Sequence, residues 1–152
     1  MMMKQKIVTI LCFCSVLFAS AQTSTMEIST SQLVGTKWER VLPEERGALH
    51  TLMFTEKDYI TSTRYDGEDK SYTYYNEYYI TDEQPSSLEC PTDYIGKERK
   101  GHYLVIYFLN DKDLDYRTVV SLTDDELLLF RKATPGQIPN LDIYIKYKRI
   151  KE

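Results

Sequence analysis

Three aspartates at alternate positions have the spacing of a metal site. Asp111, Asp113 and Asp115 match the opening of an EF-hand calcium loop, in which alternate carboxylates supply oxygen ligands. That loop needs glycine at its sixth position and glutamate at its twelfth, where this chain has Tyr116 and Leu122. The pattern therefore fails as a calcium loop and is typical of a solvated hairpin turn that leads into a strand.

A cysteine and two histidines are the residue types that could form a nucleophile with its general base. Cys90, His50 and His102 lie in three separate segments, and nothing in their spacing brings them together. They also lack the paired spacing that structural zinc sites use. We therefore expect neither catalysis nor a metal ion or other cofactor, with both histidines at the surface. Cys90 is expected to be a small packed residue, while a reactive thiol or an intermolecular link stays open.

Tyrosine is the most distinctive residue type of the chain. Of the 13 tyrosines, five fall between Tyr72 and Tyr79. A tyrosine combines a wide apolar face with a hydrogen-bonding tip, which suits simple strand filling first, and also a ligand-lined interior or an interaction surface. For a ligand site inside the fold we predict Tyr74, Tyr78 and Tyr116, with Arg64 as a source of charge that could equally face solvent.

The first 21 residues have the organisation of an export signal. Lys4 and Lys6 precede an uncharged run of 12 residues from Ile7 to Phe18, and Ala19-Ser20-Ala21 gives the pattern that a signal peptidase recognises. This run is too short to span a bilayer, since a membrane helix needs about 20 residues. We therefore predict cleavage after Ala21 and a periplasmic or secreted protein, with no transmembrane segment in the mature chain.

The composition of the remaining chain argues against nucleic acid as a partner. Removal of residues 1–21 leaves 131 residues, the size of one domain. Of the 19 basic side chains Lys4 and Lys6 are lost, so 17 basic and 23 acidic side chains give a net charge of −6. Proteins that bind nucleic acid instead concentrate Lys and Arg against the phosphates. Cys90 is the only cysteine after residue 21, so the mature chain has no internal disulfide.

Short runs rich in Val, Ile, Tyr, Phe and Thr alternate with turn residues after Gly35, which indicates β structure. Residues 22–32 are rich in Ser and Thr and are predicted to be a flexible lead to a domain over residues 33–152. The link over residues 81–102 could contain a short strand near Tyr94-Ile95. The eight predicted strands are Thr36–Val41, His50–Thr55, Tyr59–Tyr65, Ser71–Ile80, Tyr103–Leu109, Leu114–Leu122, Leu127–Lys132 and Asp142–Ile150.

Alternation along each strand indicates which side chains face the interior. Eight strands joined mainly by hairpins, with one apolar face, predict an all-β fold, a single antiparallel up-and-down β-barrel. Closure removes exposed sheet edges, and the interior of such a barrel is filled by side chains or holds one small ligand. The predicted inner residues are Ile143, Ile145, Tyr147 and Arg149 in the last strand, and Leu114, Tyr116, Val120 and Leu122, opposite Asp115, Arg117 and Ser121, in the sixth.

The start of the first strand resembles a known family. Gly35-Thr36-Lys37-Trp38, with Leu33 before it, is similar to the Leu-x-Gly-x-Trp opening of the bacterial lipocalin-like domains, with the tryptophan one residue later. The segment Val120–Leu127 and the closing strand Ile143–Arg149 also resemble that family, so the resemblance covers residues 33–150. It implies a calycin-type barrel in which the tryptophan plugs the closed end beneath a basic side chain of the last strand. This pairs Trp38 with Arg149 in a structural role.

Two functions from different classes fit these observations. The first is an exported lipocalin-like binding protein that holds a small apolar or amphipathic molecule in the barrel. The alternative is an interaction module of the cell envelope, which docks on another envelope or secreted protein through the tyrosine-rich strands and residues 81–102. The enclosed volume distinguishes them, because ligand pockets usually measure about 300–1,000 Å³ and a smaller cavity favours the alternative.

Overall fold

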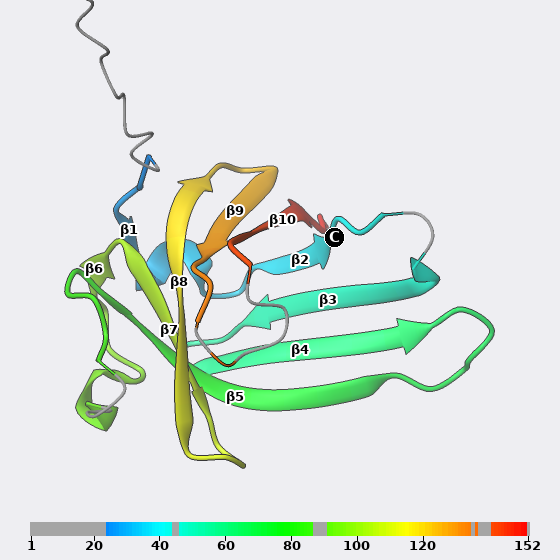
Figure 1. The fold of residues 1–152 in the computed structure, drawn as a ribbon, viewed down its shortest axis with the longest axis horizontal. Helices are drawn as coiled ribbons and strands as arrows, with labels where there is room; N and C mark the ends of the chain where they lie inside the picture. The colour runs from blue at the N-terminus through cyan, green and yellow to red at the C-terminus, as the bar shows by residue number, and fades with distance from the viewer. Residues whose placement is uncertain (1–23, 44–45, 87–90, 135, 137–140, 152) are drawn as a thin grey trace, which may run out of the picture.

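An antiparallel β-barrel forms the body of the protein (Figure 1). The computed structural model describes residues 24–43, 46–86, 91–134, 136 and 141–151; the predicted signal and Cys90 lie outside them. Each barrel strand pairs with the next along the chain, and the last pairs with the first, which confirms the predicted fold class and strand order. The strands are β2 (Lys37–Arg40), β3 (Ala48–Phe54), β4 (Asp58–Tyr65), β5 (Tyr72–Thr81), β7 (Tyr103–Phe108), β8 (Asp113–Leu122), β9 (Glu126–Arg131) and β10 (Ile143–Arg149).

The hydrophobic core fills one end of the barrel, called the closed end below. Trp38, Phe54, Tyr78 and Leu104 are each at most 1% exposed and belong to one apolar cluster. The Phe54 ring lies edge-on to Tyr59 and Tyr78, with centroid distances of 5.6 and 5.1 Å. Because burial of one large apolar side chain contributes about 1.5–3 kcal/mol, this cluster is the main source of stability.

The residues before the first barrel strand pack on the closed end. β1 (Ile28–Ser29) pairs with β6 (Lys100–Gly101), and the helix α1 (Thr30–Leu33) follows. Ile28 and Leu33 are 2% and 0% exposed and are part of the core cluster. The prediction of a flexible lead over residues 22–32 is therefore wrong from Ile28 onwards, because isolated apolar residues among Ser and Thr anchor this segment.

Residues 91–99, which precede β6 and β7, pack against the outer face of β5. This segment contains the short helix η2 (Thr92–Tyr94) instead of the strand predicted near Tyr94-Ile95. The Tyr94 ring lies edge-on to Tyr79, with centroids 5.6 Å apart. The guanidinium of Arg99 lies 3.5 Å from the centroid of the Tyr94 ring, and its Nε donates to the carbonyl of Ile80 at 2.8 Å. This cover explains why Tyr79 is buried although it points away from the core.

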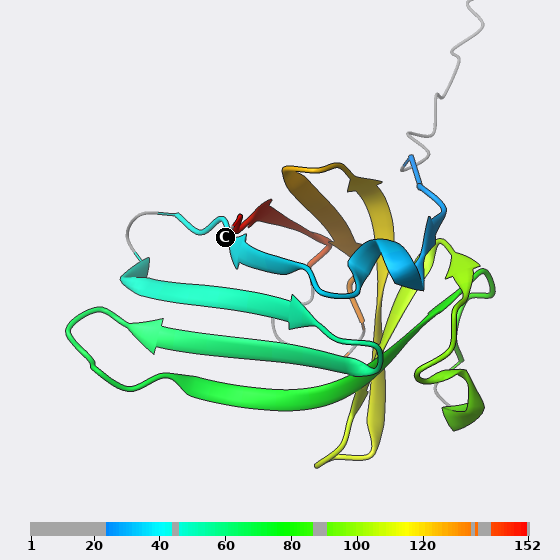
Figure 2. The same ribbon diagram turned by 180° about the vertical axis from the view of Figure 1, so that it is seen from behind.

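Strands β3, β4 and β5 run past the rest of the barrel at its other, open end (Figures 1 and 2). β5 pairs with β4 over Tyr72–Glu77, but with β7 only over Glu77–Thr81. Within the part of the chain that the structure describes, no strand pairs with the second edge of Tyr72–Asn76. The expectation that closure removes every edge is therefore wrong at this end, because β5 outruns β7.

The direction of one backbone hydrogen bond identifies the groups that this free edge presents. The amide of Tyr78 donates to the carbonyl of Lys57, on the β4 side of β5. In an antiparallel ladder every second residue directs its N–H and C=O to the same neighbour. Tyr74 and Asn76 therefore bond towards β4, while Thr73 and Tyr75 present their N–H and C=O groups to the free edge.

Candidate functional site

A cluster of charged side chains lies inside the open end of the barrel. It consists of Arg40, Arg117, Arg131 and Asp115, which come from strands β2, β8 and β9. Alternation from a buried residue fixes each direction, because side chains two positions apart, or directly opposite across a ladder, share a face. Arg40 and Arg131 each follow a core residue by two positions, Trp38 and Leu129 respectively. Arg117 and Asp115 are directly opposite the core residues Leu104 and Ile106 on β7.

Asp115 joins two of the three arginines. Its Oδ2 atom lies 2.7 Å from Nη1 of Arg117 and 3.4 Å from Nε of Arg131. The three side chains are only 13–21% exposed, so their charges are weakly screened by water. No ion pair recorded between described residues includes Arg40. Asp115 thus contacts Arg117 and Arg131 but not Arg40, and the guanidinium groups of Arg40 and Arg117 give the neighbouring cavity a positive lining.

Two tyrosines line the same interior: Tyr147 is directly opposite Arg40 in the ladder between β2 and β10, and Tyr59 contacts Phe54 of the core. Tyr59 and Tyr147 are each 7% exposed, and the two phenols interact electrostatically. Burial raises the pKa of Tyr59 well above 10, and Tyr147 raises it further, against the opposing effect of Arg117. Burial also raises the pKa of Tyr147, against Arg40. Both phenols therefore stay protonated at neutral pH and remain hydrogen-bond donors.

His50 lies at the mouth of the same space. Its Nδ1 is 2.8 Å from Oγ1 of Thr63, which holds the ring against β4. Partial burial lowers the pKa of His50 below the ordinary value of 6.5, and the nearby charges of Arg40 and Arg46 lower it further. The imidazole is therefore neutral at pH 7 and adds no charge to the arginine cluster.

The space between these side chains is a small cavity. It measures about 160 Å³ and is lined by both tyrosines, His50, Arg40, Arg117 and the apolar side chain of Ile145. This volume is below the roughly 300 Å³ at which pockets for drug-sized ligands begin. Positive charge, phenolic donors and one apolar wall suit a small negatively charged group better than an enclosed apolar molecule.

None of the four predicted ligand residues lines this cavity, and one of them, Tyr78, is part of the core. Tyr78 is 1% exposed at the closed end, where its hydroxyl donates to the carbonyl of Thr55 at 2.8 Å. Burial raises the pKa of its phenol. Tyr74 has the inward parity of Tyr78 but is 58% exposed, because it stands where β5 has left the barrel.

Tyr116 faces outwards, which corrects its predicted direction. It pairs with Val105, its ring lies 5.8 Å from that of Tyr103, and its hydroxyl accepts a hydrogen bond from Gln84 at 2.8 Å. The cause is a bulge in β8 between Val119 and Ser121. The extra residue reverses the alternation upstream, so that Asp115 and Arg117 point inwards instead.

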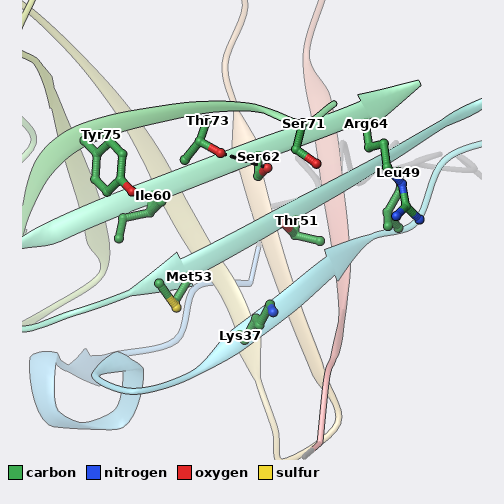
Figure 3. A pocket seen from close by; sticks show the side chains of 10 residues that line it. All are labelled: Lys37, Leu49, Thr51, Met53, Ile60, Ser62, Arg64, Ser71, Thr73 and Tyr75. Atoms are coloured by element: carbon green, nitrogen blue, oxygen red, sulfur yellow. Dashed lines mark hydrogen bonds between the residues drawn. The ribbon is translucent and has the colours of Figure 1, made fainter. Parts of the chain in front are cut away.

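Arg64 also lies on the outer face. It lines a groove of about 340 Å³ across β2 to β5, shown in Figure 3, together with Lys37, Thr51, Met53, Ser62 and Tyr75, among others. The structure therefore does not bring Tyr74, Tyr78, Tyr116 and Arg64 together. The charged residues that sequence reasoning missed are Arg40, Arg117 and Arg131. Arg40 and Arg131 carry a usable signal, since each follows a core residue by two positions.

The contact implied between Trp38 and Arg149 is present at the closed end. The two residues are directly opposite in the ladder between β2 and β10, and the guanidinium lies 5.4 Å from the centroid of the indole ring. Trp38 is 0% exposed, and its Nε1 donates to Oγ1 of Thr36 at 2.7 Å. Both residues belong to the closure of the barrel, two positions along β2 and β10 from the pair Arg40 and Tyr147.

The free edge of β5 carries the most exposed aromatic surface of the described chain. Tyr72, Tyr74 and Tyr75 of β5 and Tyr65 of the neighbouring β4 are between 47% and 62% exposed, and the rings of Tyr65 and Tyr72 lie edge-on with centroids 6.1 Å apart. Ser71–Asn76 contains no charged residue and no proline. Exposed edge strands normally carry such residues, or a bulge, because these prevent pairing with another chain. This edge lacks that protection.

Comparison with known proteins gave no match to any protein-family model, curated protein or solved structure. In the described ranges, no helix is both long and apolar enough to cross a membrane. Nor do three His, Cys, Asp or Glu side chains of these ranges converge as ligands for a metal ion.

Proposed function

We propose that the chain is an exported, lipocalin-like interaction module that binds an extended segment of a partner protein along the free edge of β5. The unpaired edge of Tyr72–Asn76 is the observation that carries this proposal. Thr73 and Tyr75 offer backbone donors and acceptors there, and an added strand would satisfy them as in other cases of strand addition. The edge is about 17 Å long, enough for a five-residue segment.

The tyrosines of β5 would give the interaction its specificity. Residues of the partner segment alternate between two faces, so they would contact Tyr72 and Tyr74 on one side and Tyr75 on the other. Aromatic and β-branched side chains make the most favourable cross-strand neighbours for tyrosine. The turn before β5 carries Asp66, Glu68 and Asp69 against the single cation Lys70, so its net negative charge favours a basic residue at the partner's end beside it. The partner segment is thus expected to be aromatic or β-branched and basic at one end.

The small interior supports docking over an enclosed ligand. Core side chains fill the closed end, and the cavity at the open end measures about 160 Å³. A barrel that holds an apolar or amphipathic molecule inside needs about twice this volume. The export signal predicted in residues 1–21 supports a partner in the cell envelope or outside the cell.

Photo-crosslinking in cells of the native host tests this proposal. A benzophenone amino acid replaces Tyr75 on the edge or, as control, Tyr144, which is 56% exposed on β10. We expect a product with another protein from position 75 only, with the crosslinked partner peptide in an extended segment. Thr73→Pro removes one edge N–H and should abolish the product, while Thr73→Ala keeps that N–H and should retain it.

Two results would overturn the proposal. One is an equal yield of products from positions 75 and 144, which would make the contact unspecific. The other is a product with twice the mass of the chain itself, which would assign the edge to pairing between two copies.

A further inference from the structure

We infer that the open end of the barrel is a second binding site, specific for a compact oxyanion held between Arg40 and Arg117. This site is separate from the β5 edge in its residues and its chemistry. Both guanidinium groups line the cavity of about 160 Å³, and their five N–H donors each can bind carboxylate or phosphate oxygens in a forked geometry.

The charge balance of the site calls for an anion. Asp115 already contacts Arg117 and Arg131 through the same oxygen atom, at 2.7 and 3.4 Å. Arg40 is half-buried in the same interior and takes part in none of the recorded ion pairs. Partly buried charge is unfavourable unless an opposite charge compensates it. A bound anion would supply that compensation at the side of the cavity that Asp115 does not reach.

The other walls define the class of anion. Tyr59 and Tyr147 line the cavity and stay protonated, so a phenolic O–H can donate a hydrogen bond to a ligand oxygen. Ile145 provides an apolar wall that would contact a short hydrocarbon group. The cavity measures about 160 Å³, roughly half the volume at which pockets for drug-sized ligands begin, so it is too small to enclose a long acyl chain. A small carboxylate with a short apolar group fits these walls best, and inorganic phosphate shares the same oxyanion chemistry.

Calorimetric titration with matched ligands tests the inference on the purified chain at constant ionic strength. The ligands are benzoate and butyrate, their neutral analogues benzamide and butyramide, and phosphate. We expect saturable binding of at least one anion, no binding of either amide, and a rise in Tm with the anion that binds. Tighter binding of benzoate or butyrate than of phosphate would identify the carboxylate as the ligand; the reverse order would identify the phosphate.

Arg40→Gln is the decisive variant, because Arg40 forms no ion pair with another described residue that the substitution would break. It should weaken anion binding at least about tenfold, since charge-assisted hydrogen bonds contribute that much. Arg64→Gln makes the same change of charge in the outer groove and should leave binding unchanged. The inference is overturned if no anion binds, if the amides bind as well as the anions, or if both variants have the same effect. None of these results bears on the β5 edge, whose test uses other residues.

Discussion

Arg149 and Trp38 are directly opposite residues on the last and first strands of the barrel, and the guanidinium lies 5.4 Å from the centroid of the indole ring. The indole also donates to Thr36, whose hydroxyl donates in turn to the carbonyl of Leu33 at 2.6 Å. One tryptophan thus connects the closing pair of strands to the helix α1. Trp38 is also the largest of the fully buried side chains in the described core.

Replacement of this tryptophan should destabilise the fold strongly. Trp38→Ala leaves a large cavity at a fully buried position, and the loss of such an aromatic side chain costs about 3–5 kcal/mol. The free energy of unfolding in urea measures this effect. Tyr144→Ala, at an exposed position, should change it by less than about 1 kcal/mol. Equal stability of Trp38→Ala and the native chain would remove Trp38 from the core.

Loss of the buried phenol of Tyr78 should have a small but measurable effect. Tyr78→Phe keeps the packing against Phe54 but removes the hydrogen bond to the carbonyl of Thr55. The expected loss is about 1 kcal/mol, the typical contribution of one buried hydrogen bond. Tyr75→Phe is the matched control on the exposed edge and should be neutral in the same urea titration. An equal effect of the two substitutions would contradict the burial of Tyr78.

A methyl group added at Gly101 should disrupt the pairing of β6 with β1. A Cβ atom there would overlap the backbone of Thr81, so Gly101→Ala must displace β6 and with it β1. We expect rapid proteolysis within residues 24–33 and a lower Tm. Gly67→Ala meets open space and costs only the strain of a positive φ, roughly 1–2 kcal/mol. Intact residues 24–33 in Gly101→Ala would show that β6 tolerates a side chain.

The pH dependence of His50 follows from its position beside the arginines. Burial and the neighbouring cations lower its pKa in the folded chain, so the unfolded chain binds more protons just below pH 6.5. Stability must therefore fall as the pH decreases through 6.5 towards the lower folded pKa, and His50→Gln should reduce this loss. An NMR titration of the His50 ring should give a midpoint below 6.5. A midpoint above 6.5 would place the ring next to a negative charge instead.

The sequence predicts the strands of this protein well because the local signals agree. Residues that favour strands form runs of the right length, and charged or glycine-containing turns separate them. The N-terminal segment lacks this agreement. Ile28 and Leu33 are isolated apolar residues in a Ser/Thr-rich stretch, and only their tertiary contacts with the barrel order them. No local sequence pattern predicts these contacts between the N-terminal segment and the barrel.

The interior of the open end is harder to predict, for two physical reasons. A bulge adds one residue to β8 and reverses the direction of Tyr116 and Arg117, and no composition signal marks its position. Strand length is the second reason. Tyr74 has the parity of a core residue, but it lies beyond the point where β7 ends and is therefore exposed. Parity alone cannot show where neighbouring strands stop.

Amide hydrogen exchange along β5 tests the free edge most directly, because it needs no partner. In the isolated chain the N–H groups of Thr73 and Tyr75 should exchange rapidly, while those of Tyr74 and Asn76, bonded to β4, should be protected. Slow exchange at Thr73 and Tyr75, equal to that at Tyr74, would mean that this edge is already paired and would contradict the proposed docking site.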